Sequence, residues 1–292
     1  MNLKTWVLAT RPKTLSAAIV PVLMATALVA VRPGGGIVWW AFGCALAGSV
    51  LIQIATNFIN DALDFRKGAD TRERLGPMRV TQAGLVSADT VMRAAAVALA
   101  LAALCGVPLI YRGGWPMLVI GLTSIAAAYA YTGGPYPLAY HGLGEVFVVA
   151  FFGVVAVGGT YYVLTLDAPP VVFVAGIGAG TVATVLLVIN NLRDIDTDRA
   201  SRKKTLAVRM GPAFARFEVA LFAILPLVAA AVAAWMLGNR WLLLPWAASP
   251  LALVLIRRCY RSAGAELNRA LALAGAYQWA YGVLFVIGVL MR

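Results

Sequence analysis

The sequence predicts an all-α polytopic membrane protein, a bundle of nine transmembrane helices. Two fractions support this class: 62% of the 292 residues are hydrophobic and only 12% are charged, about half the charged share of a soluble domain. The charges also fall in short runs between long uncharged stretches, as in membrane proteins. These features exclude disordered, collagen-like and disulfide-stapled secreted proteins. They also favour membrane topology over nucleic-acid binding as the origin of the net charge of +12.

Nine charge-free stretches are candidate spans, because a helix needs roughly 20 apolar residues to cross a hydrocarbon core. In the fourth stretch, glycines and prolines at 133–137 form a turn that ends the helix near Tyr131. The eighth stretch is short and contains Pro245 and Pro250. In chain order the stretches are Thr14–Val31, Pro33–Asn60, Ala94–Tyr111, Gly113–Gly144, Val146–Leu166, Ala168–Leu192, Val219–Asn239, Trp241–Ile256 and Ala270–Met291.

The basic residues predict the orientation of this bundle. With the N-terminus inside, 20 of the 24 Lys and Arg residues fall in inner segments. The outer segments then hold only Arg32, Arg112, Arg240 and Arg292. Because basic residues accumulate on the cytoplasmic side, we expect an N-in, C-out protein with an odd number of spans. The first stretch also has the composition of a cleaved signal peptide, but eight further spans need no such signal.

Two acidic stretches, 57–70 and 190–205, lie at the inner ends of the second and sixth spans. In each, an asparagine and two aspartates are spaced to share one helix face. The sets are Asn57, Asp61 and Asp64 at i, i+4 and i+7, and Asn190, Asp194 and Asp198 at i, i+4 and i+8. Carboxylates near hydrocarbon are costly and repel one another, so a cation is expected between them. Because oxygen ligands and phosphates suit Mg²⁺, these six side chains are candidate metal ligands, and the four aspartates are candidate catalytic residues.

Basic residues accompany both acidic stretches. Carboxylates that hold Mg²⁺ beside Lys and Arg are suited to a diphosphate. The alternative is ordinary loop charge, which flanks the inner ends of spans in any membrane protein. The candidate diphosphate-binding residues are Arg66, Lys67, Arg72, Arg79, Arg193, Lys203 and Lys204.

The two acidic stretches also repeat along the chain. Asp61 and Asp194 are 133 positions apart, and Asp64 and Asp198 are 134 apart. Each stretch lies at the end of the second helix in a set of four, namely spans two and six. We therefore expect two pseudo-repeated four-helix halves around a central cavity, with the acidic faces opposite one another, in a single domain that covers residues 1–292.

These motifs resemble the UbiA-type intramembrane aromatic prenyltransferases. The resemblance rests first on Asn60-Asp61-x-x-Asp64-x-x-x-Gly68-x-Asp70 and on the Asp194-x-x-x-Asp198 stretch. Three further segments, 11–15, 76–84 and 131–140, and the run from Asn190 to Arg209 are similar to the branch of this family that acts on 1,4-dihydroxy-2-naphthoate. The matches extend from residue 11 to about residue 211. One departure is Ser201, where the family often has a glycine before the basic pair.

The resemblance implies a nine-helix fold in the cell (inner) membrane, with its active site open to the cytoplasm. It implies that Mg²⁺ joins the acidic motifs to the diphosphate of a polyprenyl donor. It further implies transfer of the polyprenyl group to 1,4-dihydroxy-2-naphthoate with loss of CO₂, which gives demethylmenaquinol in menaquinone biosynthesis. Polyprenyl diphosphate, the naphthoate and the lipid bilayer are then the expected partners.

The residues that would bind the aromatic acceptor are less clearly marked in the sequence. His141 is the only histidine, and it follows a turn on the inner side, where it would either contact the acceptor or serve the structure. Glu145 would orient or deprotonate the acceptor. Lys13, with Arg11, would meet the acceptor carboxylate or anchor the first helix. The candidate acceptor-binding residues are Lys13, Gln82, Tyr140, His141 and Glu145.

Three alternatives remain open at this point. The CDP-alcohol phosphotransferases also place aspartates on membrane helices, but in a single cluster, whereas this chain has two. A cation-coupled transporter would need carboxylates near helix breaks, generally close to the bilayer midplane. Within the prenyltransferases, another aromatic acceptor such as 4-hydroxybenzoate would use the same acidic motifs.

Overall fold

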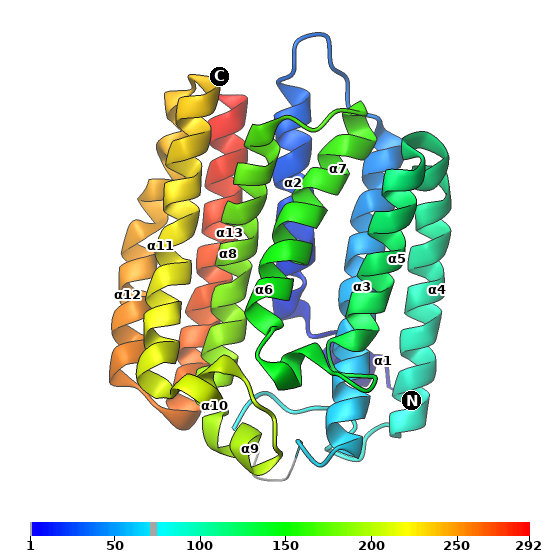
Figure 1. Ribbon diagram of the computed structural model, residues 1–292, viewed down its shortest axis with the longest axis vertical. Coiled ribbons are helices and arrows are strands. Elements are labelled where there is room, and N and C mark those ends of the chain that lie inside the picture. The colour runs from blue at the N-terminus through cyan, green and yellow to red at the C-terminus, as the bar shows by residue number, and fades with distance from the viewer. Residues whose placement is uncertain (1, 71–74) are drawn as a thin grey trace.

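The computed structural model describes residues 2–70 and 75–292, and it is helical throughout, with no strand among them. Figure 1 shows the long helices packed side by side, with the N-terminus near one end of the bundle and the C-terminus at the other. The elements are α1 Leu3–Thr10, η1 Pro12–Thr14, α2 Ser16–Ala30, α3 Trp39–Arg66, α4 Ala88–Gly113, α5 Trp115–Ala130, η2 Leu138–His141, α6 Gly144–Val148, η3 Val149–Val155, α7 Ala156–Thr165, α8 Pro170–Arg193, α9 Ile195–Ala200, α10 Leu206–Met210, α11 Pro212–Leu237, η4 Arg240–Ala248, α12 Ser249–Arg261, η5 Gly264–Glu266 and α13 Leu267–Leu290.

By length and composition, seven of the described helices can cross a membrane, and an eighth can if a bent pair counts as one span. The bent pair is Leu3–Thr14 with Ser16–Ala30, which meet at 54°. α5 is apolar but has only 16 residues, short of the roughly 20 that a perpendicular span requires. Each expected stretch nevertheless coincides with a helical segment. The expected nine crossings are reached only if α5 and the bent pair each count as one span.

Two of the expected spans depart from regular α-helix. The expected fifth span is continuous from Gly144 to Thr165, but its middle section, η3, is π-helical. The expected eighth span begins as a 3₁₀ segment, η4, which contains Pro245. Proline removes an amide donor and disfavours regular α-helix, which accounts for the second case. Insertions of π-helix often occur at functional sites, and η3 lines the cavity described below.

η3 packs against α8 through glycine backbones. A Cβ atom added to Gly153 would lie 2.3 Å from the carbonyl oxygen of Gly176 and 2.8 Å from the Cα of Gly180. No side chain fits in that space, so the two helices are in direct backbone contact. This contact fixes the position of α8, whose last turn carries Asn190, against the wall of the cavity.

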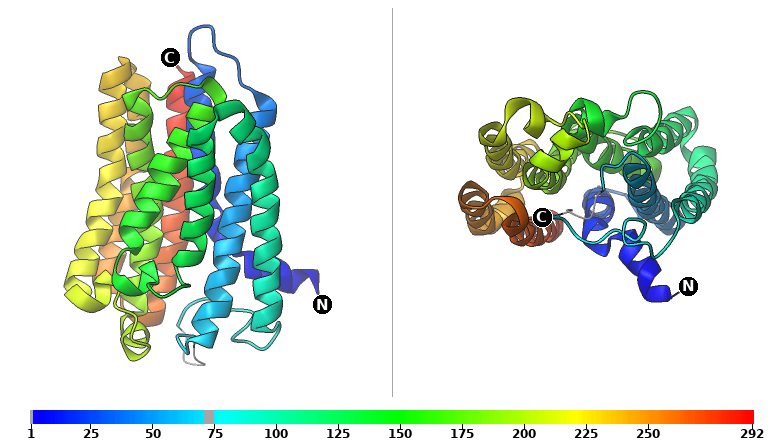
Figure 2. Two further views of the ribbon diagram at one scale, coloured as in Figure 1. Left: turned by 45° about the vertical axis from the view of Figure 1, so that its right-hand side comes forward. Right: turned by 90° about the horizontal axis from the view of Figure 1, so that it is seen from below.

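The acidic stretches lie together at one end of the bundle. α3 ends at Arg66, and α8 ends at Arg193, where it is followed by the short helix α9. Figures 1 and 2 show both helix ends, with α9, at the end of the bundle opposite the C-terminus.

Candidate active site

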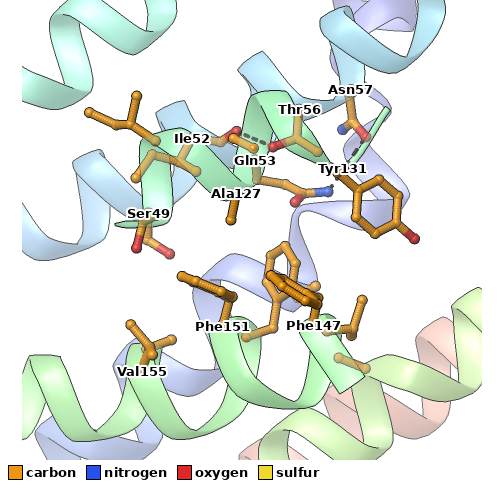
Figure 3. Close-up of a pocket in the computed structure, with 18 of the residues that line it drawn as sticks. Ser49, Ile52, Gln53, Thr56, Asn57, Ala127, Tyr131, Phe147, Phe151 and Val155 are labelled. Atoms are coloured by element: carbon orange, nitrogen blue, oxygen red, sulfur yellow. Dashed lines mark hydrogen bonds between the residues drawn. The ribbon is translucent and has the colours of Figure 1, made fainter. Parts of the chain in front are cut away.

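A cavity of about 430 Å³ extends through the bundle from the acidic end toward its apolar middle. Its walls come from α2, α3, α4, α5, the α6–η3–α7 segment and α8. Asp64 and Asp194 line its polar end, whereas Leu109 and Met117 line its apolar end. Figure 3 shows Phe147 and Phe151 of the α6–η3 segment facing Gln53 and Tyr131 across the cavity. The cavity therefore suits a ligand with one charged end and one long apolar end.

Carboxylates from both acidic stretches meet in a small adjoining pocket at the polar end. Asp64 comes from the last turn of α3, and Asp70 from the loop that follows it. Asp194 caps α8, and Asp198 lies on α9. Segments more than 120 positions apart in the chain thus supply two carboxylates each. This is the relationship that the sequence repeat predicts, although one of the four residues differs from the expected set.

Arg79 holds the first pair of carboxylates together. One guanidinium nitrogen, Nη1, lies 2.8 Å from Asp64 Oδ2 and 2.5 Å from Asp70 Oδ2, and it donates to the carbonyl oxygen of Asn60 at 2.9 Å. Burial alone would lower the pKa of Arg79, but Asp64 and Asp70 raise it above its usual range. Arg79 was expected to bind diphosphate. In this structure it is a buried cation that pairs two carboxylates.

Asp61 lies outside this pocket. Its carboxylate accepts hydrogen bonds from the backbone amides of Val80 and Thr81 at 3.1 and 3.2 Å. It therefore anchors the loop that carries Arg79, and Asp70 stands in the pocket position expected for Asp61. Helical spacing could not predict a role for Asp70, because that residue lies beyond the end of α3. The only sequence signal for it was its place in the quoted motif.

Asn57 is also engaged in structural contacts. Its side-chain amide donates to the carbonyl oxygen of Thr10 at 2.9 Å and to the hydroxyl of Thr14 at 3.0 Å. Asn60, one turn closer to Asp64, lines the large cavity and accepts a hydrogen bond from the Thr132 hydroxyl. The face of α3 that turns toward the carboxylates thus carries Asn60 and Asp64.

The second acidic stretch is not one continuous helix. Asp194 adopts φ −98° and ψ 15°, so α8 ends and α9 starts in a new direction. The carboxylate of Asp194 forms a two-point pair with Arg193, whose Nε and Nη2 lie 2.7 and 2.6 Å from its oxygens. Asn190, still on α8, lines the large cavity but not the small pocket. Asn190 therefore shares the large cavity with Asp194 but does not reach the small pocket that Asp194 and Asp198 line.

Lys203 contacts Asp198 from the loop after α9. Its Nζ lies 3.5 Å from Asp198 Oδ1, and its backbone amide donates to the Asp198 carbonyl oxygen at 2.8 Å. Burial raises the pKa of Asp198 to about 6; Lys203 opposes this, while Asp194 and Asp64 add to it. Burial lowers the pKa of Lys203, but the facing carboxylates of Asp198 and Asp64 raise it further, and the net shift is upward.

Tyr140 belongs to the carboxylate cluster, although it was expected to bind the acceptor. Its hydroxyl donates to Asp64 Oδ1 at 2.9 Å. Its ring centre lies 4.6 Å from the Nζ of Lys67 and 5.7 Å from the Nζ of Lys203, within the range of cation–π contacts. Burial and the Asp64 carboxylate raise the pKa of Tyr140, so the hydroxyl stays a donor.

The other expected basic residues make different contacts. Lys67 donates to the carbonyl oxygen of Thr132 at 2.5 Å. Arg66 pairs with Asp89 at the exposed start of α4, and the Lys204 side chain is exposed. Arg72 lies outside the described residues. Of the expected diphosphate-binding residues, Arg79, Arg193 and Lys203 line the cavity.

Of the expected acceptor-binding residues, Glu145 lines the cavity, where its carboxylate accepts a hydrogen bond from Asn191 at 2.9 Å. Lys13 is exposed, and neither it nor Gln82 is among the described residues that line the cavity. His141 stacks on Tyr136 with ring centres 3.6 Å apart, and its Nδ1 lies 2.9 Å from a backbone carbonyl oxygen. These contacts of His141 serve the structure of the turn. Asn191 also lines the cavity, although helical spacing did not mark it as a site residue.

The donor set of the small pocket fits a hard divalent cation. Its carboxylates offer only oxygen ligands, and Asp198 Oδ2 is buried without a hydrogen-bond partner. In the part of the chain that the structure describes, no three Asp, Glu, His or Cys side chains converge closely enough to hold an ion. Arg79 and Lys203 contact three of the carboxylates instead. A cation would therefore bind where these side chains now balance the charge.

Residues 18–290 match the UbiA prenyltransferase family. The chain is 38% identical over 248 residues to the 1,4-dihydroxy-2-naphthoate octaprenyltransferase of Mycobacterium tuberculosis, covering 85% of this chain and 83% of that protein. It is 35% identical over 226 residues to the protein of the same name from Escherichia coli, covering 73% and 70%.

Solved structures share the fold at low sequence identity. A UbiA homologue from Aeropyrum pernix superposes with a TM-score of 0.70 at 14% identity, over 98% of both chains. A UbiA homologue from Archaeoglobus fulgidus bound to DMAPP and Mg²⁺ gives a TM-score of 0.65 at 13% identity, over 96% of this chain and 99% of that one. These superpositions establish the architecture of the bundle.

Proposed function

Because the chain belongs to the UbiA prenyltransferase family, we propose that it transfers a polyprenyl group to 1,4-dihydroxy-2-naphthoate. Polyprenyl diphosphate is the donor, diphosphate and CO₂ are released, and the product is demethylmenaquinol for menaquinone biosynthesis. The names of the similar proteins support the choice of acceptor. The observation that carries the reaction type is the small pocket of four carboxylates and two cations, which adjoins an apolar cavity.

The polar end of the cavity would bind the diphosphate. Asp64, Asp70, Asp194 and Asp198 would hold Mg²⁺, which neutralises charge on the leaving diphosphate. Lys203 and Arg193 lie at the same end of the cavity and would contact the phosphate oxygens. Tyr140 fixes Asp64 by its hydrogen bond, and Arg79 fixes Asp64 and Asp70. Residues that already hold one another in place avoid a reorganisation cost when charge develops.

The apolar end of the cavity would hold the prenyl chain and exclude water from the reacting carbon. The allylic C–O bond breaks, and its electron pair leaves with the diphosphate. The ring carbon that bears the carboxylate then forms the new C–C bond. The bond to the carboxylate breaks next, its electrons restore the aromatic ring, and CO₂ leaves. No proton leaves the ring in this sequence, so the transfer needs no general base. Phe147 and Phe151 present aromatic faces to the space where positive charge develops.

We further propose nine membrane crossings, with α5 and the bent pair α1–α2 each counted as one. The N-terminus and the carboxylate pocket would face the cytoplasm in a cell (inner) membrane. The distribution of the basic residues supports this orientation. A water-soluble acceptor and diphosphate would then reach the polar end of the cavity directly, while the prenyl chain stays within the bilayer.

The test is prenyl transfer by the purified protein in lipid nanodiscs. Farnesyl or geranylgeranyl diphosphate is supplied with either 1,4-dihydroxy-2-naphthoate labelled in its carboxylate or 4-hydroxybenzoate, and with Mg²⁺ or excess EDTA. We expect product from the naphthoate only, one labelled CO₂ for each product molecule, and none with EDTA. Product from hydroxybenzoate alone would overturn the acceptor assignment. No product from either acceptor, in protein that gives a cooperative thermal transition, would overturn the function.

A further inference from the structure

The chain turns sharply at Arg11, between α1 and η1. Arg11 has φ 51° and ψ 68°, a left-handed conformation that residues other than glycine rarely adopt. The turn directs Arg11 into the wall of the large cavity, whereas Lys13, two residues later, is exposed. Such conformations persist only where the surroundings impose them, and they occur often at functional sites.

Hydrogen bonds to α3 hold this turn in place. Asn57 donates to the carbonyl oxygen of Thr10 at 2.9 Å and to the hydroxyl of Thr14 at 3.0 Å, so it bonds on both sides of Arg11. Gln53 donates to the same Thr14 hydroxyl at 3.3 Å. Arg11, Thr14, Gln53 and Asn57 all line the cavity. They make up a polar wall of the cavity.

The Gln53 side chain presents a buried acceptor to this wall. Gln53 is only 7% exposed, and its Oε1 is buried without a hydrogen-bond partner. Figure 3 shows Gln53 beside Asn57 and across the cavity from Phe147. A buried acceptor without a donor is costly, and a ligand hydroxyl in the cavity would satisfy it. The wall therefore offers one cation and one hydrogen-bond acceptor.

The wall lies at a suitable distance from the carboxylate pocket. Asn57 and Asp64 are seven residues apart on α3, which corresponds to about 10 Å along the helix. Asn60 lies between them and lines the same cavity. A two-ring aromatic acid held at the wall would thus adjoin a diphosphate held at the pocket, with no protein segment between them.

We propose that Arg11 and Gln53 bind the acceptor. The guanidinium of Arg11 pairs with the acceptor carboxylate, and Gln53 Oε1 accepts a hydrogen bond from the neighbouring ring hydroxyl. This inference rests on the proposed function. Because the new bond forms at the carbon that bears the carboxylate, a two-point hold on the carboxylate and the hydroxyl sets the position of that carbon. Of the two residues expected to meet the acceptor carboxylate, Arg11 and Lys13, Arg11 thus takes the role.

Two fluorescent probes test the roles of the two residues separately. 1-Hydroxy-2-naphthoate carries both the carboxylate and the hydroxyl, and 1-naphthol carries only the hydroxyl. Binding of each is measured for the parent protein, Arg11→Gln, Arg11→Lys, Gln53→Leu and the matched control Lys13→Gln. We expect Arg11→Gln to weaken binding of the naphthoate by roughly 10- to 100-fold and to leave binding of 1-naphthol unchanged. Arg11→Lys should recover part of the loss, Gln53→Leu should weaken both probes, and Lys13→Gln should change neither.

The KM for each substrate tests the same assignment kinetically. Arg11→Gln should raise the KM for the naphthoate and leave the KM for the prenyl diphosphate within about twofold, because only the carboxylate contact is lost. An equal loss for both probes, or for both substrates, would show a general structural role and overturn the proposal. So would unchanged binding of the naphthoate. If the parent protein neither binds nor prenylates any aromatic acid, the proposed function itself has failed, and the variants are not needed to show it.

Discussion

The hydroxyl of Tyr140 donates a hydrogen bond of 2.9 Å to Asp64 Oδ1, while the other oxygen of Asp64 lies 2.8 Å from Arg79. A residue of the η2 turn thus fixes a carboxylate at the end of α3. The ring of Tyr140 also contacts two lysines, Lys67 and Lys203. The turn therefore orients both the anions and the cations of the candidate site.

Replacing this hydroxyl tests the orientation of Asp64. We expect Tyr140→Phe to lower the affinity for Mg²⁺ or the turnover by about 10-fold, because groups that orient metal ligands have effects of about 10- to 100-fold. The matched control is Tyr136→Phe, since Tyr136 is exposed and stacks on His141 outside the cavity. Titration with Mg²⁺ in the presence of a non-hydrolysable prenyl diphosphate measures the effect. If Tyr140→Phe and Tyr136→Phe had the same affinity for Mg²⁺ and the same turnover, the prediction would be contradicted.

The aspartates of the first acidic stretch should separate into two groups. Asp64→Asn and Asp70→Asn should each lower Mg²⁺ affinity and activity by orders of magnitude, with some loss of stability because the buried Arg79 keeps only one of its two charged partners. Asp61→Asn should leave the affinity for Mg²⁺ unchanged and destabilise the protein by about 1–3 kcal/mol, because two buried backbone amides lose a charged acceptor. Mg²⁺ titration and thermal unfolding distinguish the two classes. A loss of metal affinity for Asp61→Asn equal to that for Asp70→Asn, at unchanged stability, would show that Asp61 binds the ion.

The affinity for Mg²⁺ should depend on pH through Asp198. Burial raises the pKa of this carboxyl to about 6, above the ordinary value of 3.8. The group is therefore protonated below pH 6, and a metal ligand must be deprotonated. Between pH 7.5 and 5.5 the ionised fraction falls about fourfold, and the affinity for Mg²⁺ should fall at least in proportion. In Asp198→Asn this part of the pH dependence should vanish. A parent protein whose affinity is flat over this range would contradict the expectation.

The glycine contact between η3 and α8 should tolerate no side chain. Gly153→Ala would place a Cβ atom 2.3 Å from the Gly176 carbonyl oxygen, and such overpacking costs about 1–3 kcal/mol. The control is Gly121→Ala, because a Cβ atom there would meet no atom within 4 Å. Thermal unfolding in one detergent compares the two variants. A transition for Gly153→Ala equal to that for Gly121→Ala would show that the helices can separate without loss.

The sequence predicts the positions of the long helices well, because bilayer thickness sets a minimum length that charge-free stretches reveal. It predicts the individual site residues less well. Helical spacing assumes that a helix continues, but α3 ends before Asp70, and α8 breaks at Asp194. Because α3 has ended, helical spacing does not reveal Asp70 as a carboxylate of the pocket. The break in α8 places Asp194 and Asp198 on different segments, although their pairing across the bundle with Asp64 was still predicted.

The contacts at Arg11 and Tyr140 could not be predicted from spacing at all. The direction of Arg11 depends on a left-handed backbone conformation, which the residue type alone does not favour. Tyr140 reaches Asp64 through a tertiary contact between the η2 turn and the end of α3, which joins residues 76 positions apart. The resemblance to a known family identified the segments that contain both residues, but not what each of them touches.

The carboxylate pocket has a mechanical consequence for the bundle. Its anions come from two segments, the end of α3 with its loop and the junction of α8 with α9. Arg79 and Lys203 offset part of the repulsion between these like charges, and a divalent ion with its diphosphate would pull the two segments together. The donor would then act as a cross-link between the first and second parts of the chain, and an unloaded bundle would be the looser one. Resistance to proteolysis at this end should therefore report how much of the protein is loaded.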